Sequence, residues 1–229
     1  KKFKVDDNLS TMKVGTDAVL LGTSVKMSSY QEILEIGTGC GVIALILAHR
    51  GKAHIDAIEI DEQSATQAAE NFSRNPCDSN IEAHHISLQQ FVAVTQKQYD
   101  LIVSNPPYFS RSLKSSHLSR NLSRHDATLT HDELARFSHV LLKPEGSLWV
   151  ILPATESKEF IKTAEYFGFH LHLITKIFPK PGKCHLRSIL EFKKNVPDFL
   201  HEKALNIRDQ DNNYSKEYKE LTGKFYLDF

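Results

Sequence analysis

The sequence predicts an α/β protein with a mainly parallel sheet and helices on both faces. Short apolar runs rich in β-branched residues alternate with longer helical patterns, as is typical of strands joined by crossover helices. A glycine-rich turn at residues 37–41 follows the first strand and opens a helix. Farther along, only residues 179–182 (Pro-Lys-Pro-Gly) separate two strands, which predicts an antiparallel hairpin at one edge of the sheet.

The expected elements follow one another in a regular order. Each of seven predicted strands is a short apolar run. They are expected at residues 32–36, 54–60, 81–86, 99–104, 147–152, 169–177 and 186–192. Each of five predicted helices has apolar residues at helical spacing. They are expected at residues 42–49, 62–74, 88–94, 130–142 and 156–166. Asp61 is placed to cap the second of these helices, and Asp17 to cap an earlier one. We expect the apolar residues 225–227 to pack the tail back onto the body.

Length and composition indicate a single domain over residues 1–229. A chain of 229 residues, 41% of them hydrophobic, buries a sufficient core without disulfides or metals. Lys+Arg and Asp+Glu both number 28, so the zero net charge excludes a protein that coats nucleic acid by charge alone. No apolar run approaches the roughly 20 residues of a membrane helix, and the three cysteines have no zinc spacing. We therefore expect a monomeric cytoplasmic protein that uses neither a membrane nor a metal.

Two segments stand apart from the alternating pattern. Residues 1–30 precede the first strand of the predicted sheet, and residues 110–126 form a long polar stretch with no strand signal. A loop of that length inside a compact domain is more often functional than filler. We expect the first segment to lie near a cofactor and a substrate, and the second to be a substrate loop.

The glycine turn carries the first functional signal. Glu35-Ile36-Gly37-Thr38-Gly39-Cys40-Gly41 runs from a strand into a helix, where glycines admit a ligand close to the backbone and helix-start N–H groups favour anions. Glu59 ends the second strand about twenty residues on, the place where a carboxylate grips ribose hydroxyls. Together these residues favour a nucleotide-like cofactor over a bare turn.

This constellation resembles the class I S-adenosylmethionine-dependent methyltransferases, whose acidic-x-Gly-x-Gly-x-Gly turn matches Glu35 to Gly41. The resemblance implies a Rossmann-like fold and binding of S-adenosylmethionine, with S-adenosylhomocysteine as product. It implies that Glu59 binds the ribose and that Ile60 packs on the adenine. The position after the third strand, often acidic in that family, is Ser87 here, followed by Leu88, whose N–H is available to the adenine.

A second signal follows the fourth strand, where the chain reads Asn105-Pro106-Pro107-Tyr108. Two prolines remove donors and stiffen the turn, so that an amide oxygen and a backbone carbonyl can face one amino group while an aromatic ring stacks on a flat substrate. The segment resembles the catalytic motif of methyltransferases that act on amino groups. The resemblance implies that Asn105 and the Pro106 carbonyl accept hydrogen bonds from the target nitrogen beside the cofactor, and that Tyr108 stacks on the base.

Further matches extend the resemblance over nearly the whole chain. The stretch from Met12 to Gly22 is similar to the corresponding stretch of the bacterial valine-tRNA (adenine-N6)-methyltransferases, as are the motifs already named and a Tyr218 to Leu227 tail. The resemblance implies methylation of adenosine N6 just 3′ of a valine anticodon. It also implies that Lys13, Thr16 and Asp17 lie near the methionine end of the cofactor or the target base.

The basic residues near the expected strand-end edge suit the phosphates of an RNA substrate. An anticodon-loop base also suits the site, because it is readily splayed out and stacked on an aromatic ring. The candidate phosphate contacts are Arg111, Lys114, Arg120, Arg124, Lys180, Lys183 and Arg187. Two alternatives stay open. One is the same chemistry on another amino group, of protein glutamine, ribosomal guanine or DNA adenine. The other is a non-catalytic RNA-binding protein that needs the cofactor.

Overall fold

One sheet of eight strands organises the computed structural model, which describes residues 3–27, 30–107 and 129–225. The strand order is β3-β2-β1-β4-β5-β7-β6-β8. The strands are β1 (Glu32–Ile36), β2 (His54–Glu59), β3 (Asn80–His85), β4 (Tyr99–Ser104), β5 (Leu142–Pro153), β6 (His170–Phe178), β7 (Arg187–Lys193) and β8 (His201–Asn206). Strands β1 to β5 are parallel neighbours, whereas β7 runs antiparallel to both β5 and β6. The predicted parallel sheet with a late antiparallel hairpin is confirmed, but the hairpin of β6 and β7 is not at the edge, because β8 pairs with β6 outside it.

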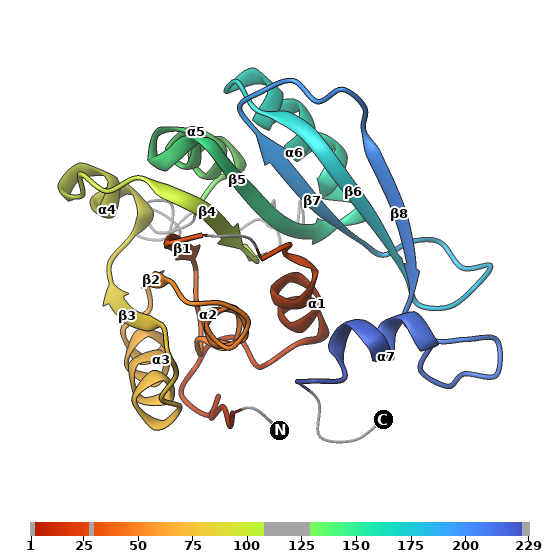
Figure 1. The fold of residues 1–229 in the computed structure, drawn as a ribbon, viewed down its shortest axis with the longest axis horizontal. Helices are drawn as coiled ribbons and strands as arrows, with labels where there is room; N and C mark the ends of the chain where they lie inside the picture. The colour runs from red at the N-terminus through yellow and green to blue at the C-terminus, as the bar shows by residue number, and fades with distance from the viewer. Residues whose placement is uncertain (1–2, 28–29, 108–128, 226–229) are drawn as a thin grey trace, which may run out of the picture.

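Helices cover both faces of the sheet (Figure 1). They are α1 (Thr16–Ser24), α2 (Val42–Ala48), α3 (Glu62–Arg74), α4 (Leu88–Val94), α5 (His131–Leu141), α6 (Ala154–Tyr166) and α7 (Lys216–Thr222). Residues of α1, α2, α3 and α7 share one hydrophobic core with the sheet, and residues of α4, α5 and α6 share the other. None of the helices in the described part of the chain has the length and apolarity needed to cross a membrane.

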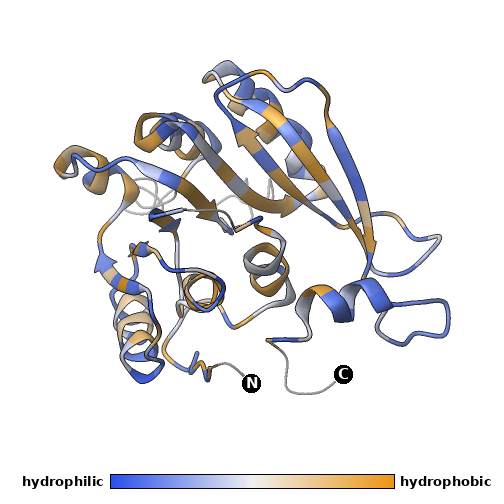
Figure 2. Cartoon of the chain, viewed as in Figure 1, coloured by the Kyte–Doolittle hydropathy of each residue, from blue (hydrophilic) through white to orange (hydrophobic). Residues whose placement is uncertain are grey.

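The central strands are apolar because both of their faces are covered. In β4, Leu101, Ile102 and Val103 are completely buried, although consecutive side chains point to opposite faces. The outermost strand β8 is different, since its first four residues are exposed and it is drawn largely in the hydrophilic colour (Figure 2). The sequence predicts seven strands because β8 lacks an apolar run. It pairs parallel with β6 through backbone hydrogen bonds that composition does not reveal.

Of the two predicted helix N-caps, one is confirmed and the other is wrong. Asp61 caps α3, as predicted, by accepting a hydrogen bond from Ser64 N at 2.8 Å. The N-cap of α1 is Gly15, which makes no side-chain cap bond, and Asp17 is the second residue of the helix. Asp17 is drawn instead into an ion pair with Arg187, so its carboxylate is not the cap. At the other end of the chain, Phe225 packs against the core as expected, while residues 226–227 lie outside the described residues.

Candidate active site at the carboxyl ends of the central strands

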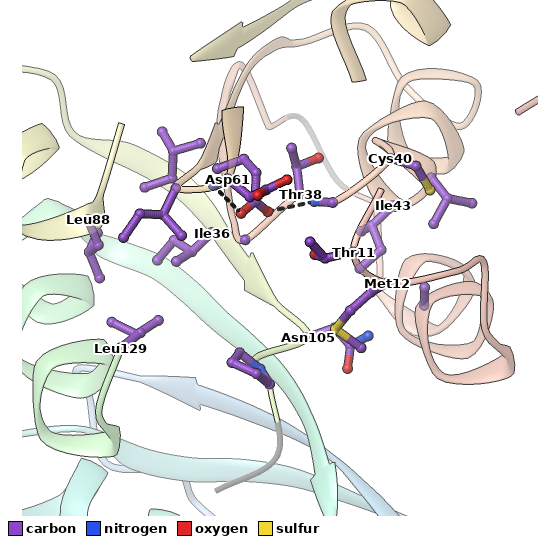
Figure 3. Close-up of a pocket in the computed structure, with 18 of the residues that line it drawn as sticks. Thr11, Met12, Ile36, Thr38, Cys40, Ile43, Asp61, Leu88, Asn105 and Leu129 are labelled. Atoms are coloured by element: carbon purple, nitrogen blue, oxygen red, sulfur yellow. Dashed lines mark hydrogen bonds between the residues drawn. The ribbon is translucent and has the colours of Figure 1, made fainter. Parts of the chain in front are cut away.

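A cavity of about 350 Å³ opens at the carboxyl ends of β1, β2 and β4, a size within the range of small-ligand sites. Figure 3 shows Leu88 and Leu129 at one end of this cavity and Met12 and Asn105 at the other. Its walls come from the N-terminal segment, the glycine turn, the end of β2, the start of α4 and the residues after β4. The lining residues that the sequence singled out are Lys13, Asp17, Gly37, Gly39, Glu59, Ile60, Ser87, Leu88, Asn105 and Pro107.

The glycine turn is held close to β2 and α3. Gly37 N and Thr38 N both donate to Ile58 O, at 2.9 and 3.1 Å. Gly41 has φ +85°, and a Cβ atom built there would lie 2.4 Å from Phe72 Cε1 on α3. Gly41 therefore lies beneath the cavity wall, where it allows the turn to pack on α3.

Glu35 lies under the same turn and does not line the cavity. It is completely buried, and its Oε2 accepts hydrogen bonds from Thr38 Oγ1 and Ala44 N, both at 2.8 Å. Burial raises its pKa to about 8, against the opposing effect of these two bonds. Through these two hydrogen bonds, Glu35 stabilises the conformation of the turn from its buried side. The neighbouring Cys40 thiol lines the cavity, and burial raises its pKa to about 11, which leaves the thiol neutral and unreactive.

The Glu59 carboxylate links the glycine turn to the start of α3 across the floor of the cavity. Its Oε2 accepts from Gly39 N at 2.9 Å, and its Oε1 accepts from Asp61 N at 3.0 Å. A carboxylate offers about four acceptor positions, so two remain for hydroxyl groups of a ligand. The next side chain, Ile60, lines the cavity although 47% of its surface is exposed, which leaves an uncovered apolar surface for a flat ring.

The opposite wall is the first turn of α4. Ser87 forms a reciprocal capping box with Gln90, in which its Oγ accepts from Gln90 N at 3.2 Å and its own N–H donates to Gln90 Oε1 at 3.2 Å. The Ser87 side chain is therefore committed to the helix start. Leu88 takes the first helical position, where the backbone N–H has no intrahelical partner. Gln89 also lines the cavity, and its Nε2 donates to Glu133 Oε1 of α5 at 2.9 Å.

Asn105 lies at the end of β4, directly after a strand end that is tied to β1 by a 2.9 Å bond from Ser104 Oγ to Ile36 O. The Asn105 Oδ1 atom is buried, and no hydrogen bond reaches it from the part of the chain that the structure describes. A buried acceptor left unpaired is costly, so a ligand donor at this position would be stabilising. Pro107 lines the cavity beside Asn105, whereas Pro106 does not.

The N-terminal wall is fastened by a row of polar side chains on α3. Asn75 and Asn71 each exchange two hydrogen bonds with the backbone, with Lys4 and Asp6 respectively, at 2.7–3.0 Å. Gln67 Oε1 and Ser64 Oγ then accept from Leu9 N and Thr11 N. The spacing 64, 67, 71 and 75 places these side chains on one face of a helix.

One cluster outside the cavity has metal-ligand character. Ligand atoms of Asp56, Glu82 and His84 lie within 4.8 Å of one another. Asp56, however, already accepts hydrogen bonds from Lys97 Nζ at 2.9 Å and Tyr99 OH at 2.7 Å. Burial works to raise the pKa of Asp56, but these bonds and one with His84 outweigh it and hold that pKa below its usual value. The cluster is a satisfied structural network, and the absence of a metal stays a prediction.

The chain matches a known protein family over most of its length. Residues 9–171 match the model of the methyltransferase small domain family. A tRNA1(Val) (adenine(37)-N6)-methyltransferase from Phocaeicola vulgatus is 41% identical over 99% of this chain and 96% of that protein. One of the same name from Cytophaga hutchinsonii is 35% identical, also over 99% and 96%.

The chain belongs to the tRNA1(Val) (adenine(37)-N6)-methyltransferase family.

Solved structures agree on the fold of this family member. A predicted O-methyltransferase from Agrobacterium tumefaciens has a TM-score of 0.68 and 19% identity, over 91% of this chain and 96% of that one. The 16S rRNA N2 G1207 methyltransferase of T. thermophilus, solved with AdoMet and guanosine, has a TM-score of 0.56 and 20% identity, over 81% of this chain and 45% of that one. The expected Rossmann-like fold of a class I methyltransferase is thereby confirmed.

The structure brings most of the cofactor residues predicted for this methyltransferase to one cavity and leaves three outside its lining. Glu35 and Gly41 lie beneath the turn, as described above. Thr16 is the first residue of α1 and is not part of the cavity wall. Lys13 lines the cavity, and its Nζ donates to Asp7 O at 2.6 Å. The individual roles of these residues in cofactor binding stay predictions.

The predicted RNA contacts of the methyltransferase divide into two groups. Tyr108, Arg111, Lys114, Arg120 and Arg124, together with the expected substrate loop at 110–126, lie outside the described residues. Lys180 and Lys183 lie in the turn between β6 and β7, outside the cavity lining. Arg187 differs from both lysines because its Nε donates to Asp17 Oδ2 at 2.7 Å.

The sequence did not single out several residues that line the cavity. Thr11, Gln89 and Leu129 all contribute to its walls, as does Met12, which the sequence marked only as the start of the family-like stretch. Thr11 and Met12 do so because α3 holds the N-terminal segment in place, and Gln89 because α5 holds its amide. These contacts join segments far apart in the chain. Only the capping pattern at Ser87 and Gln90 was visible as a local sequence signal beside Gln89.

Proposed function

We propose that this chain transfers a methyl group from S-adenosylmethionine to N6 of adenine 37 in the valine tRNA named tRNA1(Val). The curated relatives carry this activity in their names and match 99% of the chain at 35–41% identity. The observation on this molecule that supports the proposal most directly is the buried, unpaired Oδ1 of Asn105 beside the cavity.

The cavity fits the methyl donor of this class in size and in the chemistry of its walls. The glycine turn admits close approach of a ligand to its backbone, and two acceptor positions of the Glu59 carboxylate suit ribose hydroxyls. Ile60 and Leu88 offer apolar surface to an adenine ring, and the N–H of Leu88 suits a ring nitrogen. When bound, S-adenosylmethionine supplies an electrophilic methyl group on its sulfonium sulfur.

The role of Asn105 is to position the target nitrogen. Its Oδ1 accepts a hydrogen bond from the adenine N6 amino group, so that the nitrogen lone pair can face the methyl carbon. With S-adenosylmethionine bound, N6 would take the methyl group, S-adenosylhomocysteine would leave, and the displaced proton would pass from N6 to water. An amide oxygen takes no proton at neutral pH, so the rate enhancement comes from orientation and electrostatics.

The deciding experiment incubates labelled S-adenosylmethionine with unmodified valine tRNA, protein and DNA, followed by digestion of the RNA to nucleosides. We expect label in N6-methyladenosine from valine tRNA, and none from the same tRNA with guanosine at position 37. Asn105→Ala should lower turnover by about 100-fold or more, whereas the exposed Asn195→Ala should not change it.

Other outcomes would redirect the proposal. Label in protein or DNA would keep the chemistry and overturn the substrate. Binding of S-adenosylmethionine without label in any acceptor would favour the non-catalytic RNA-binding protein. A monomer that works in the cytoplasm is part of the same proposal, and light scattering that gives the mass of two chains would contradict its first half.

A further inference from the structure

The first turn of α1 forms part of the cavity wall but begins without a side-chain cap. Asp17 and Ala18 line the cavity, and the segment just before them contributes Lys13 and Gly15. Gly15, the N-cap residue, makes no side-chain cap bond. An uncapped helix start frays easily. Asp7 holds the segment just before the helix, because its Oδ2 accepts from Val14 N at 3.0 Å, so a contact from outside the helix would stabilise the first turn itself.

Arg187 provides that contact from a remote strand. Its Nε donates to Asp17 Oδ2 at 2.7 Å, and its Nη1 donates to Leu186 O at 3.0 Å. The ion pair joins residues 170 positions apart, and the two side chains are only 29% and 18% exposed. A planar guanidinium that makes two directed bonds fixes its partner more rigidly than a lysine would.

The backbone that carries Arg187 is itself firmly held. Arg187 is the first residue of β7 and pairs with Pro153 of β5 and Ile177 of β6. Leu186, just before it, donates from its N–H to Ile177 O and accepts from Ala154 N at the start of α6. The ion pair therefore ties the first turn of α1 to the carboxyl end of β5, the strand beside β4 and Asn105.

We propose that Arg187 is a positioning residue for the methyltransferase reaction, which acts by holding Asp17 and with it the first turn of α1, where Asp17 and Ala18 line the cavity. This assignment replaces its predicted role as a phosphate contact and rests on the proposed function, because the wall it holds is the wall of the cofactor cavity. Binding of the cofactor needs that wall in place, so loss of Arg187 weakens cofactor binding even when no RNA is present.

The test measures affinity for S-adenosylmethionine by calorimetry, without RNA, in wild type, R187Q, D17N and the double variant. We expect each single variant to bind about tenfold more weakly, and the double variant to bind no more weakly than the weaker single one, since either change breaks the same pair. Arg208→Gln removes an arginine that lies over Tyr214 far from the cavity and serves as the matched control with unchanged affinity.

A second measurement does not depend on the cofactor. Amide hydrogen exchange of the ligand-free protein should be faster at residues 16–19 in R187Q than in wild type, with α2 unchanged. Should R187Q not fold, D17N tests the same pair from its other side while preserving side-chain size.

Three results would overturn the assignment. The first is equal affinity and equal exchange in wild type and R187Q. The second is losses in the two single variants that add in the double variant. The third is a higher KM for tRNA with a shallower salt dependence and unchanged cofactor affinity, which would identify a phosphate contact. Failure of the wild type to bind S-adenosylmethionine would instead overturn the proposed function, and the exchange measurement would still report on Arg187.

Discussion

Gly41 determines how closely the cofactor turn can approach α3. Its φ of +85° lies in the left-handed region, and a Cβ atom there would meet Phe72 Cε1 at 2.4 Å. Gly37, in the same turn, has φ +72° but no atom within 4 Å of the corresponding position. The two glycines therefore serve different purposes, since Gly41 is required by packing and Gly37 by backbone conformation alone.

Gly41→Ala is expected to destabilise the fold by about 3 kcal/mol, because it combines left-handed strain with overpacking against a buried ring. Gly37→Ala, the control in the same turn, should cost about 1 kcal/mol through backbone strain alone. Urea unfolding followed by circular dichroism measures both. Equal losses in the two variants would contradict the packing role of Gly41.

Glu35 makes stability depend on pH in a predictable direction. Burial raises its folded-state pKa to about 8 from an ordinary value of 4.5, so between these values the folded state binds more protons than the unfolded chain. The contribution of a protonated Glu35 is thus fully present below pH 4.5 and is lost as the pH rises through 8. The stability of wild type relative to Glu35→Gln should fall by a few kcal/mol between pH 5 and 9.

Urea unfolding of wild type and Glu35→Gln at pH 5, 6, 7, 8 and 9 measures this dependence. Glutamine keeps the shape and an oxygen acceptor for Thr38 and Ala44 but cannot ionise. A difference in unfolding free energy that stays constant over the whole pH range would show that Glu35 ionises normally.

At the scale of elements, α3 does more than cover the sheet. Its polar face carries Ser64, Gln67 and Asn71, and these residues together with the C-cap residue Asn75 bind a segment with no regular secondary structure between Lys4 and Thr11. Asn71 is the central contact, because it is 1% exposed and its Nδ2 also donates to Cys40 O in the glycine turn at 2.8 Å. One side chain therefore joins α3, the N-terminal segment and the cofactor turn.

Asn71→Ala is expected to cost about 2–4 kcal/mol, because it leaves the buried Cys40 carbonyl and the half-buried backbone of Asp6 without these partners. Asn75→Ala, the matched control at the exposed end of the same row, should cost less than about 1 kcal/mol. Unfolding free energies measure both effects, and amide exchange at Asp6 should rise in the first variant. Similar small losses at both positions would contradict the central role of Asn71.

At the scale of the whole molecule, the strand order determines which chemistry meets in one place. Strand β1 lies between β2 and β4, so the glycine turn after β1 opens between Glu59 at the end of β2 and Asn105 after β4. Ligands of open α/β sheets bind at such a switch point, where the chain leaves in opposite directions. The cofactor floor and the candidate catalytic amide are therefore neighbours although they are separated by up to 70 residues.

Binding of S-adenosylmethionine should stabilise the whole fold. A ligand at 100 times its Kd adds about 2.7 kcal/mol, which for a chain of this size corresponds to an increase in Tm of about 5–10 °C. Differential scanning fluorimetry with and without the ligand measures the shift. Glu59→Ala should remove most of it, and Glu165→Ala, an exposed carboxylate on α6, should leave it unchanged. A shift that persists in Glu59→Ala would contradict the role of Glu59.

The amino-acid sequence alone predicts the fold class, most of the sheet and the two motifs that define the cavity. It could do so because strands, crossover helices and the glycine and Asn-Pro-Pro turns are local patterns, in which the period of apolar residues and the backbone restrictions of glycine and proline are visible in the sequence. Strand β8 was missed because it has no apolar period, and its pairing depends on backbone groups.

Contacts between segments that are distant in the chain determine which side chains line the cavity and which stabilise the fold. Glu35 and Gly41 belong to the predicted turn but face inward, because the turn packs on α3 and β2. Asp17 is an ion-pair partner and not a helix cap because folding brings Arg187, 170 residues away, to within 2.7 Å of it. Such contacts depend on the order of the strands and on burial, which no local pattern of residues encodes.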